Sequence, residues 1–585
     1  MKISRVKIKN YRNLQNVDVN LNDVVAIIGE NNSGKSNFLR AITLPFLADE
    51  WGYYGKNLSW IDINETARDE YYKFIIDRQS DIISGLINLN DFINNLPKVS
   101  VEVELKPHNV RDEYFLKELS YDIDQGEMKY ALLFEFSPSK PKEIYNLVKS
   151  ILAESQITKE TINNVKMNLL PTDYYAYSIS VPNKGSVSYD VLKNFKYVPL
   201  EAERDEFSRT KDKIGSKSLI KLLQHKLTDN DKLKVEKEYN HFFEELKSIS
   251  GMNKILNWQE ESELEEAKDF FEHISILPNM PPMQSILNSV RLGYSDEELS
   301  LQGLGYRNLI LMLVLINSYI DKKEDIALNI LTIEEPEAHL CINNERLMVS
   351  FIKAFTSNNP SIQLFYSTHS TEFINKMNLK NVIILHDGKA FSLKDELSED
   401  SMDYLTKNPN LDLFKLFFSR KCILFEGISE EMLLRSYLNS KNELNDIELI
   451  SFHKGYEEII KIWKKVNWGT KNKLGIIRDY DDQPKAQQNH DQYNDDVTIC
   501  VRTTSHYTLE PEIVYTGDNY KVLKERYGEL FGWKNMTKEE MQKAWCHAKS
   551  SNMLIICKDI EIGELKDFEM PKHIQEVLEF MKMTV

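Results

Sequence analysis

The stretch Gly29-Glu-Asn-Asn-Ser-Gly34-Lys35-Ser36 has the residue types and spacing of a phosphate-binding loop. It follows the apolar segment "VVAIIG" and precedes "KSNFLRAITLPFL", which gives the strand–loop–helix order that such a loop requires. Glycines let backbone N–H groups turn toward phosphate oxygens, and the helix N-terminus adds a partial positive charge. We therefore expect ATP to bind here, with contacts from Gly29, Asn31, Asn32, Ser33, Gly34, Lys35, Ser36 and Asn37.

A bound ATP also needs a metal ligand and a group that orients water. We expect Lys35 to reach the β- and γ-phosphates and the Ser36 hydroxyl to ligate Mg²⁺. In "ILTIEEPEAHL", a strand would deliver Glu334 toward the metal and Glu335 toward the attacking water, at the strand end where α/β sheets bind ligands. In "LFYSTHS", a second strand would place His369 beside the γ-phosphate.

A second anion-binding turn is predicted in "LSLQGLGYRNLILMLVLI", where small residues precede a long apolar helix. Ser300 and Gly303, with Gly305, could direct N–H groups toward a phosphate at the helix N-terminus. Because the first loop already serves one nucleotide, this turn is expected to serve the nucleotide of another copy, which would make ATP part of a dimer interface. The alternative is a simple turn with a helix cap.

Carboxylates of a different kind follow two apolar segments near the C-terminus. "CILFEGISEEMLL" places Glu426 at a strand end and Glu430 in the next helix, and "KLGIIRDYDD" places Asp479 and Asp481 after another strand. If the strands are neighbours, these side chains meet at one sheet edge, where hard oxygen ligands suit Mg²⁺ or Mn²⁺. Two such ions can activate water and stabilise the leaving oxygen in phosphodiester cleavage. Asp482 is an extra acid, and the sequence leaves open whether it or Asp481 binds metal.

The net charge of −17 excludes a general attraction to polyanions, so binding to DNA would need local basic patches or metal ions. The five cysteines form no C-x-x-C pair, which argues against a disulfide framework or zinc site and fits a reducing cytoplasm. The longest apolar run, "LILMLVLI", is far too short for a membrane span and is expected to be a buried helix. No membrane partner is therefore expected.

The elements that must position these residues can be placed coarsely. "KISRVKIKNYRNLQNVDVNLND" alternates with a period of two and predicts a hairpin. Residues 216–273 have apolar spacings of three and four among charges, which predicts a helical arm that packs in cis or pairs with a second copy. Residues 395–415 resemble a linker. Beyond them, alternating segments predict a β-α-β-α-β unit with a small parallel sheet.

The segments "KIKNYRNL", "GENNSGKSN", "LSLQGLG", "EEPEAHL" and "STHS", in this order, resemble an ATPase head of the ABC class, in the RecF-like and SMC-like branch. The resemblance implies that the signature loop of one head caps the ATP of another. The order of strand, E-G, helix, strand, helix, strand and D-x-D resembles the Toprim fold. Together the two halves resemble the OLD (overcoming lysogenization defect) family of ATPase–Toprim endonucleases, similar to Gabija nuclease subunits and retron-associated effectors.

This resemblance implies two further site residues. Glu510 in "HYTLEPEI", which has Glu512 nearby, would complete the second metal site, and Lys549 in "HAKSSNM" would stabilise the pentavalent phosphate. It also implies an α/β organisation in four parts: residues 1–205 as the N-terminal half of the ATPase, 206–280 as a dimerisation insert, 281–400 as the C-terminal half, and 401–585 as the Toprim domain.

The expected function is that of a homodimeric or larger, ATP-regulated and metal-dependent DNA endonuclease of antiphage defence, in which ATP hydrolysis is weak or regulatory. The partner would be a helicase or a reverse transcriptase with its RNA–DNA product, and the sequence leaves both open. One alternative is an ATP-dependent DNA clamp or repair scaffold with an inactive Toprim domain. A topoisomerase-like strand passer would need a tyrosine at a DNA gate, and no gate domain is recognisable.

Overall fold

The computed structural model describes residues 1–48, 56–124, 127–200, 223, 226–249, 281, 286–287, 290, 292–320, 328–408, 410–441, 446–452, 456–495 and 497–583. They belong to two compact units. Unit 1 contains residues 1–200, 327–335 and 349–585, and unit 2 contains residues 201–326 and 336–348. Both are built from strands and helices, so the predicted α/β class is confirmed.

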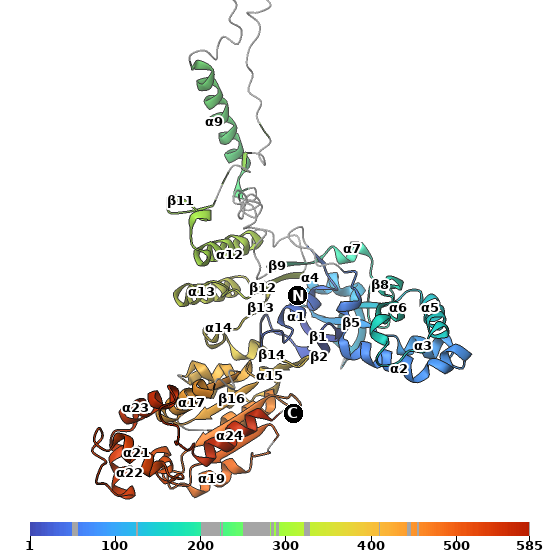
Figure 1. The fold of residues 1–585 in the computed structure, drawn as a ribbon. Helices are drawn as coiled ribbons and strands as arrows, with labels where there is room; N and C mark the ends of the chain where they lie inside the picture. The colour runs from blue at the N-terminus through green and yellow to red at the C-terminus, as the bar shows by residue number, and fades with distance from the viewer. Residues whose placement is uncertain are drawn as a thin grey trace, which may run out of the picture. The chain divides into compact units, whose positions relative to one another are not determined.

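The central sheet of unit 1 has seven strands in the order β15-β14-β3-β13-β12-β9-β4 (Figure 1). All neighbouring strands are parallel except β14 and β15. Every residue of β12, β13 and β14 is buried, as expected for a parallel sheet covered on both faces. The strands are β3 (Val24–Gly29), β4 (Leu47–Ala48), β9 (Phe195–Leu200), β12 (Leu328–Glu334), β13 (Ile362–Ser367), β14 (Val382–His386) and β15 (Lys389–Ser392).

A second sheet of unit 1 is antiparallel, in the order β2-β1-β5-β7-β6, with β8 also paired to β7. Pairing of β1 with β2 confirms the predicted N-terminal hairpin. Among the helices of this region are α2 (Glu65–Ser84), α3 (Leu89–Asn95) and α5 (Pro141–Glu154). The strands are β1 (Lys2–Tyr11), β2 (Leu14–Asn20), β5 (Val99–Lys106), β6 (Ser120–Asp124), β7 (Glu127–Pro138) and β8 (Tyr175–Ser180).

The C-terminal part of unit 1 has a four-stranded parallel sheet in the order β17-β16-β18-β19, which confirms the predicted alternation. Helix α24 lies against this sheet (Figure 1) and packs on β18 and β19. A Cβ at Gly475 would lie 2.5 Å from Val577 Cγ1 of α24. The strands are β16 (Lys421–Phe425), β17 (Ile447–Ser451), β18 (Lys473–Arg478) and β19 (Ile499–Thr503). The helices are α17 (Ile428–Lys441), α18 (Tyr456–Val466), α19 (Pro484–Asp491), α20 (Leu509–Tyr515), α21 (Asn519–Tyr527), α22 (Lys538–His547), α23 (Lys549–Glu561) and α24 (Lys572–Lys582).

The linker predicted at residues 395–415 is wrong. This region contains the helices α15 (Leu393–Glu396), α16 (Glu399–Lys407) and η10 (Leu411–Phe417). Ser398 caps α16 by accepting a hydrogen bond from the Ser401 amide. Apolar side chains between the acids are buried, among them Met402, Leu405, Leu413 and Phe414. The acidic composition therefore marks the outer face of short helices and not a solvated linker.

Unit 2 contains α9 (Asp229–Ser248), the strands β10 (Gly293–Tyr294) and β11 (Glu297–Glu298), and α12 (Leu304–Ile320). In α12, Leu309, Leu311, Met312 and Ile316 are buried, which confirms the predicted buried helix. Helix α9 agrees with a helical arm, and Thr228 forms a capping box at its start. The rest of the predicted arm at 216–273, together with most of the dimerisation insert at 206–280, lies outside the described residues.

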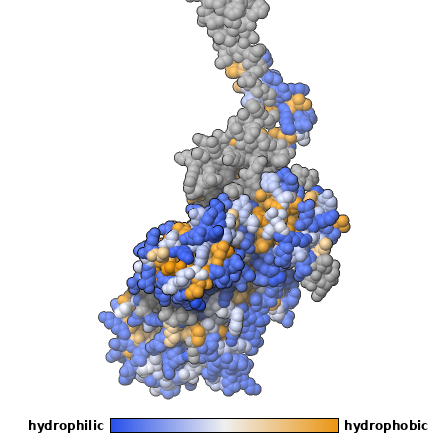
Figure 2. Space-filling model, turned by 90° about the vertical axis from the view of Figure 1, so that its right-hand side faces the viewer, coloured by the Kyte–Doolittle hydropathy of each residue, from blue (hydrophilic) through white to orange (hydrophobic). Residues whose placement is uncertain are grey.

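The face shown in Figure 2 is largely hydrophilic, with scattered hydrophobic residues. Among the described helices, none combines the length and apolar character that a membrane span requires.

Candidate functional site

The predicted phosphate loop connects β3 to α1 (Lys35–Thr43). Gly29 has a φ of 152° and Gly34 a φ of 107°, in the region that favours glycine. A Cβ at Gly29 would lie 2.5 Å from the Leu385 carbonyl oxygen, and one at Gly34 would lie 2.7 Å from Asn13 Oδ1. Both glycines are therefore required by backbone conformation and by close packing.

The charged and hydroxyl groups of the loop converge with β12. Lys35 is 6% exposed, and its Nζ donates to the carbonyls of Gly29 and Glu30 at 3.0 and 2.8 Å. The Ser36 hydroxyl donates to Glu334 Oε2 at 2.7 Å. Glu334 lies at the end of β12 and is buried. The structure thus brings together the two side chains predicted to share a Mg²⁺ ion.

Glu335 and His369 follow the neighbouring strands β12 and β13. The Glu335 amide donates to the carbonyl of Ser367 at 3.1 Å, and Glu335 has a φ of 41° that turns the chain away from the strand. Glu335 Oε1 lies 3.6 Å from His369 Nε2. Burial, followed by the charge of Lys35, lowers the pKa of His369, while Glu335 opposes that shift. The charges of Lys35 and Glu335 therefore both act on His369 beside the loop.

Two residues that the sequence analysis did not assign to the site support the loop from the turn between β1 and β2. The Asn13 side chain donates to the Asn32 carbonyl at 2.9 Å and accepts from Asn37 Nδ2 at 2.8 Å. Arg12 Nη1 donates to Asn37 Oδ1 at 2.9 Å. Asn31 and Asn32 are exposed, and Ser33 is partly exposed. The signal for Arg12 and Asn13 was present in "KIKNYRNL", directly after the first strand.

The predicted second anion-binding turn belongs to unit 2. Ser300 lies in the one-turn helix η7 (Leu299–Leu301), and Gly303 directly precedes α12. A Cβ at Gly305 would lie 2.7 Å from the carbonyl oxygen of His339, so the start of α12 packs tightly on the 336–348 segment of the same unit. The role of this turn at a nucleotide stays a prediction.

Carboxylates gather at the C-terminal ends of β16 and β18, which are adjacent and parallel. Glu426 directly follows β16, and its Oε1 accepts a hydrogen bond from the Asp479 amide at 3.3 Å. Glu430, in the first turn of α17, is 5% exposed. We call Glu426, Glu430, Asp479, Asp481 and Glu510 the carboxylate cluster.

Burial dominates the electrostatics of this cluster. It raises the pKa of Glu426 to about 7, although Arg478 opposes the shift. Burial, followed by the charges of Glu430 and Glu426, raises the pKa of Asp479 to about 9. Burial also raises the pKa of Glu430, and Glu510 adds to that shift. Such shifts are typical of functional sites where negative charge is held in excess.

The two residues implied by the family resemblance join the same cluster. Glu510 is 1% exposed, and its Oε2 lies 3.0 Å from Lys549 Nζ. Glu512 differs from Glu510, because its Oε2 accepts from the amides of Ser505 and His506 at 2.9 Å and holds that turn. Lys549 interacts with the charges of both Glu510 and Asp479, which raise its pKa against the opposing effect of burial.

Asp481 and Asp482 form the turn after β18, with φ values of 50° and 54°. Asp481 is partly exposed and its charge contributes to the raised pKa of Glu426. Asp482 is exposed to solvent. The structure therefore favours Asp481 as the member of the pair that faces the cluster.

The cluster has the donor chemistry of a divalent-cation site. Carboxylate oxygens are the preferred ligands of Mg²⁺ and Mn²⁺, and the raised pKa values reflect negative charge that a cation would neutralise. In the part of the chain that the structure describes, no three His, Cys, Asp or Glu side chains are already arranged to hold one ion. The residues therefore fit such an ion by chemistry, and their side chains would have to move together to ligate it.

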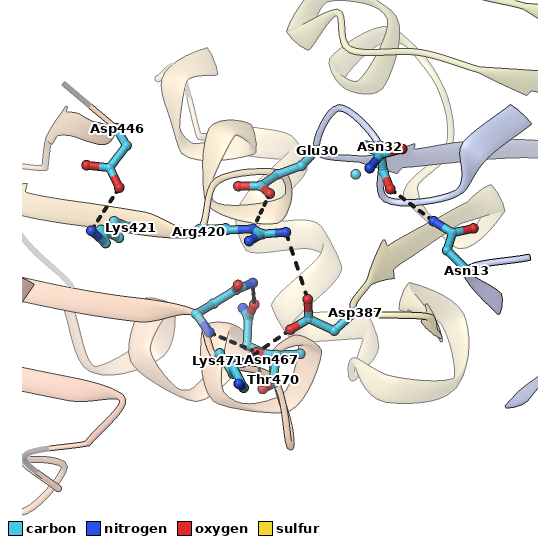
Figure 3. Close-up of polar contacts among 12 residues, drawn as sticks. Asn13, Glu30, Asn32, Asp387, Arg420, Lys421, Asp446, Asn467, Thr470 and Lys471 are labelled. Atoms are coloured by element: carbon cyan, nitrogen blue, oxygen red, sulfur yellow. Dashed lines mark hydrogen bonds and ion pairs between the residues drawn. The ribbon is translucent and has the colours of Figure 1, made fainter. Parts of the chain in front are cut away.

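Two arginines near these sites were missed by sequence reasoning. Arg478 ends β18 and is 5% exposed, and its Nε and Nη1 have no hydrogen-bond partner among the described residues. Arg420 precedes β16, and its Nε lies 2.5 Å from Glu30 Oε2 of the phosphate loop. Figure 3 shows Arg420 between Glu30 and Asp387. Glu30 and Arg420 are 390 positions apart, so no local pattern could predict this contact.

Two curated relatives are both called Endonuclease GajA. The one from Bacillus cereus strain HuB5-5 is 23% identical over 520 residues, which covers 77% of this chain and 70% of the relative. The one from Bacillus cereus strain VD045 is 23% identical over 450 residues, which covers 75% of this chain and 68% of the relative. They confirm the resemblance to ATPase–nucleases that the sequence indicates.

Among solved structures, an SMC head domain from Thermotoga maritima is 14% identical and covers 67% of this chain and 97% of its own, with a TM-score of 0.29. That score is too low to carry a conclusion about this chain. The sequence matches the family described as "AAA ATPase domain" over residues 1–374, which include the phosphate loop, Glu334, Glu335 and His369. The chain therefore belongs to the AAA ATPase domain family.

Proposed function

We propose that this chain is an ATP-binding, metal-dependent DNA endonuclease whose cleavage is regulated by nucleotide at dimerised ATPase heads. One observation carries the proposal: unit 1 holds two separate sites with phosphate chemistry. One is the phosphate loop, where Ser36 meets Glu334, and the other is the buried carboxylate cluster around Glu426 and Asp479. The relatives called Endonuclease GajA support the nuclease assignment.

In the nucleotide site, Lys35 would hold the β- and γ-phosphates, while Ser36 and Glu334 would ligate Mg²⁺. Glu335 would orient water, and His369, 3.6 Å from it, would respond to the γ-phosphate. Ser300 and Gly303 of a second copy would cap the nucleotide in a homodimer. ATP hydrolysis would then regulate assembly and need not be fast.

In the nuclease site, Glu426, Asp479, Asp481 and Glu510 would hold Mg²⁺ or Mn²⁺. The ions would supply an activated water and stabilise the leaving oxygen of a phosphodiester. Lys549 would neutralise charge on the phosphate, from its position 3.0 Å from Glu510. Glu430, in the first turn of α17, would add negative charge that attracts the metal ions.

A physical connection between the sites supports regulation. Strands β16 and β18 carry Glu426 and Asp479 at their C-terminal ends, and both begin near the phosphate loop. Arg420, just before β16, pairs with Glu30, and its carbonyl accepts from the Lys473 amide that opens β18 at 2.7 Å. At about 3.3 Å per residue, a five-residue strand spans roughly 17 Å. We infer that a change at Glu30 is transmitted to both carboxylates through these two strands, starting at the Glu30–Arg420 pair that Figure 3 shows.

We assign residues 1–205 and 281–400 to the two halves of an ABC-type head, 206–280 to a dimerisation insert, and 401–585 to a Toprim nuclease domain. The four-stranded parallel sheet with Glu426 and Asp479 at its strand ends supports the last assignment. From the family resemblance we place the activity in antiphage defence, with a helicase or a reverse transcriptase and its RNA–DNA product as the partner.

The test is a plasmid cleavage assay with Mn²⁺, using wild type and Glu426→Gln. Wild type is expected to nick or cut the plasmid, and Glu426→Gln is expected to lose that activity while it retains nucleotide binding. Equal cleavage by both proteins would refute the site. A wild type that binds DNA and ATP without cutting at any divalent ion concentration would support the alternative of an ATP-dependent DNA clamp.

A further inference from the structure

Helix α18 and the turn after it present a cluster of cations on an acidic protein. Lys461 lies three and four residues before Lys464 and Lys465 on α18, which places these lysines near one face, and Trp468 follows in the turn after the helix. Lys461 Nζ pairs with Glu457 at 2.9 Å. Lys464 and Lys465 are exposed and, within the described residues, have no carboxylate within ion-pair distance. Lys464 and Lys465 lie in the last turn of α18, where positive charge interacts favourably with the helix dipole. Helix stability does not account for the exposed Trp468 beside them.

These residues line a hollow of about 400 Å³. The three lysines and Trp468 share it with Phe391, Tyr493 and Glu396, which is its single acid. Trp468 is 73% exposed, and it is the only tryptophan among the exposed large hydrophobic residues in the described part of the chain. The hollow therefore combines flat aromatic faces with several positive charges. We call Lys461, Lys464, Lys465 and Trp468 the α18 surface.

Positive charge interleaved with aromatic rings is the pattern by which proteins hold single-stranded nucleic acid, with phosphates on cations and bases stacked on rings. Bases in a duplex are already stacked on each other, so an exposed Trp468 beside a hollow suits a strand with unpaired bases. We propose that the α18 surface binds a single-stranded segment of DNA, with phosphates on Lys464 and Lys465 and a base stacked on Trp468.

The position of α18 relates this surface to the proposed nuclease site, and in this respect the inference rests on the proposed function. Tyr456, the first residue of α18, lies in the electrostatic field of Glu426, Glu430 and Asp479. At about 1.5 Å per residue, Lys461 to Lys465 lie roughly 8–14 Å further along the helix axis. A single strand of a few nucleotides is long enough to span this distance to the proposed nuclease site.

The experiment measures the affinity of the full chain for a fluorescently labelled oligonucleotide of about 20 nucleotides, longer than typical single-strand sites. EDTA is present, so that binding is read without cleavage. In Lys464→Glu/Lys465→Glu the Kd is expected to rise at least tenfold. The slope of log K against log salt is expected to fall by about 1.4, or about 0.7 for each phosphate that the variant no longer neutralises.

Trp468→Ala separates stacking from charge. It is expected to raise the Kd between about fivefold and a hundredfold with no change in the salt slope, because a base–aromatic stack carries no charge. The matched control is Lys558→Glu/Lys566→Glu, which makes the same change of net charge at exposed positions outside the α18 surface and is expected to leave the Kd unchanged. Thermal unfolding of each variant shows that the fold is kept.

Equal Kd values for wild type and both α18 variants would overturn the inference. So would a double variant that loses binding to poly-glutamate but not to the oligonucleotide, because the surface would then serve an acidic protein. Glu426→Gln separates this inference from the proposed function. If Glu426→Gln and wild type bind equally while the α18 variants do not, the surface stands, even where wild type fails to cut.

Discussion

The phosphate loop and the carboxylate cluster differ in their charge. The loop brings Lys35 and the Ser36 hydroxyl together with closely packed backbone. Near the ends of β16 and β18, by contrast, Lys549 lies beside four carboxylates, those of Glu426, Glu430, Asp479 and Glu510. The first site is specified by shape, since a Cβ at Gly29 or Gly34 would collide with neighbours. The second is specified by charge, since burial raises the pKa values of Glu426, Glu430 and Asp479. The phosphate loop can therefore bind phosphate directly, while the carboxylate cluster needs a cation first.

The largest effect is expected from separating the two sites by mutation. Lys35→Ala should weaken nucleotide binding about a hundredfold and leave metal-dependent cleavage in the absence of nucleotide unchanged. Asp479→Asn should reduce cleavage about a thousandfold, because it removes a ligand from the proposed metal site, and leave nucleotide binding unchanged. Cleavage rates and nucleotide Kd values measured on both proteins provide the check.

Loss of both activities in either variant, with the fold intact, would mean that the two regions form one site. Glu512→Gln is a control outside the cluster. Because Glu512 holds the turn at Ser505 and His506, this variant is expected to lower stability more than it changes the metal requirement.

The excess negative charge of the cluster predicts a pH-dependent stability. The pKa of Asp479 is raised by burial to about 9, so the folded state holds a proton at neutral pH that the unfolded state has released. Stability without divalent ions should therefore fall as pH rises from 6 to 8, by about 1 kcal/mol per pH unit. Asp479→Asn should flatten this slope, and so should added Mn²⁺. Thermal unfolding in EDTA at several pH values measures it, and a wild-type Tm that rises with pH in this range would contradict it.

On the nucleotide side the pH dependence has the opposite sign. His386, at the end of β14, is 3% exposed, and burial lowers its pKa to about 4. The unfolded state takes up a proton below pH 6.5 that folded His386 does not, so stability is lost on acidification. The loss should be about 1 kcal/mol at pH 5.5. His386→Asn should show a smaller drop in Tm between pH 7.5 and 5.5 than wild type, and an equal drop would exclude His386 as the source.

The smallest effect is expected at the contact between the two regions. Arg420 is 66% exposed at its side chain, so its pair with Glu30 contributes little to stability. Arg420→Ala should keep basal cleavage and nucleotide binding, but reduce the effect of nucleotide on cleavage by about threefold. Lys421→Ala, which removes the pair that the neighbouring, partly exposed Lys421 makes with Asp446, is the matched control. An unchanged nucleotide effect in Arg420→Ala would place the coupling elsewhere.

The position and backbone turns of the phosphate loop could be predicted from the sequence, because they depend on fixed glycine positions, whereas its contacts with Arg12 and Asn13 were missed. Glu426 and Asp479 could be placed because parallel strands bring their carboxyl ends to one edge. Glu510 and Lys549 came from the family resemblance alone, and the structure places them 3.0 Å apart. These two residues lie 39 positions apart in the sequence, on different helices, which no periodicity could relate.

Contacts of long sequence separation were missed. Arg420 reaches Glu30 across 390 positions, and Arg478 is buried although its sequence position resembles that of an exposed strand end. The sequence predicts β5 as a strand but does not order the elements of residues 110–200, because β7 and β8 pair through non-local registers. The predicted linker at 395–415 failed for a different reason, since its acids alternate with apolar residues that are buried in the structure, such as Met402 and Leu405.

The most direct test of the division between the two sites is Mn²⁺ binding to the nucleotide-free protein, measured by calorimetry on wild type, Lys35→Ala and Asp479→Asn. We predict that wild type and Lys35→Ala bind Mn²⁺ with the same stoichiometry and affinity, and that Asp479→Asn loses this binding. Unchanged Mn²⁺ binding in Asp479→Asn would contradict this prediction, because the Mn²⁺ ion would then bind outside the carboxylate cluster.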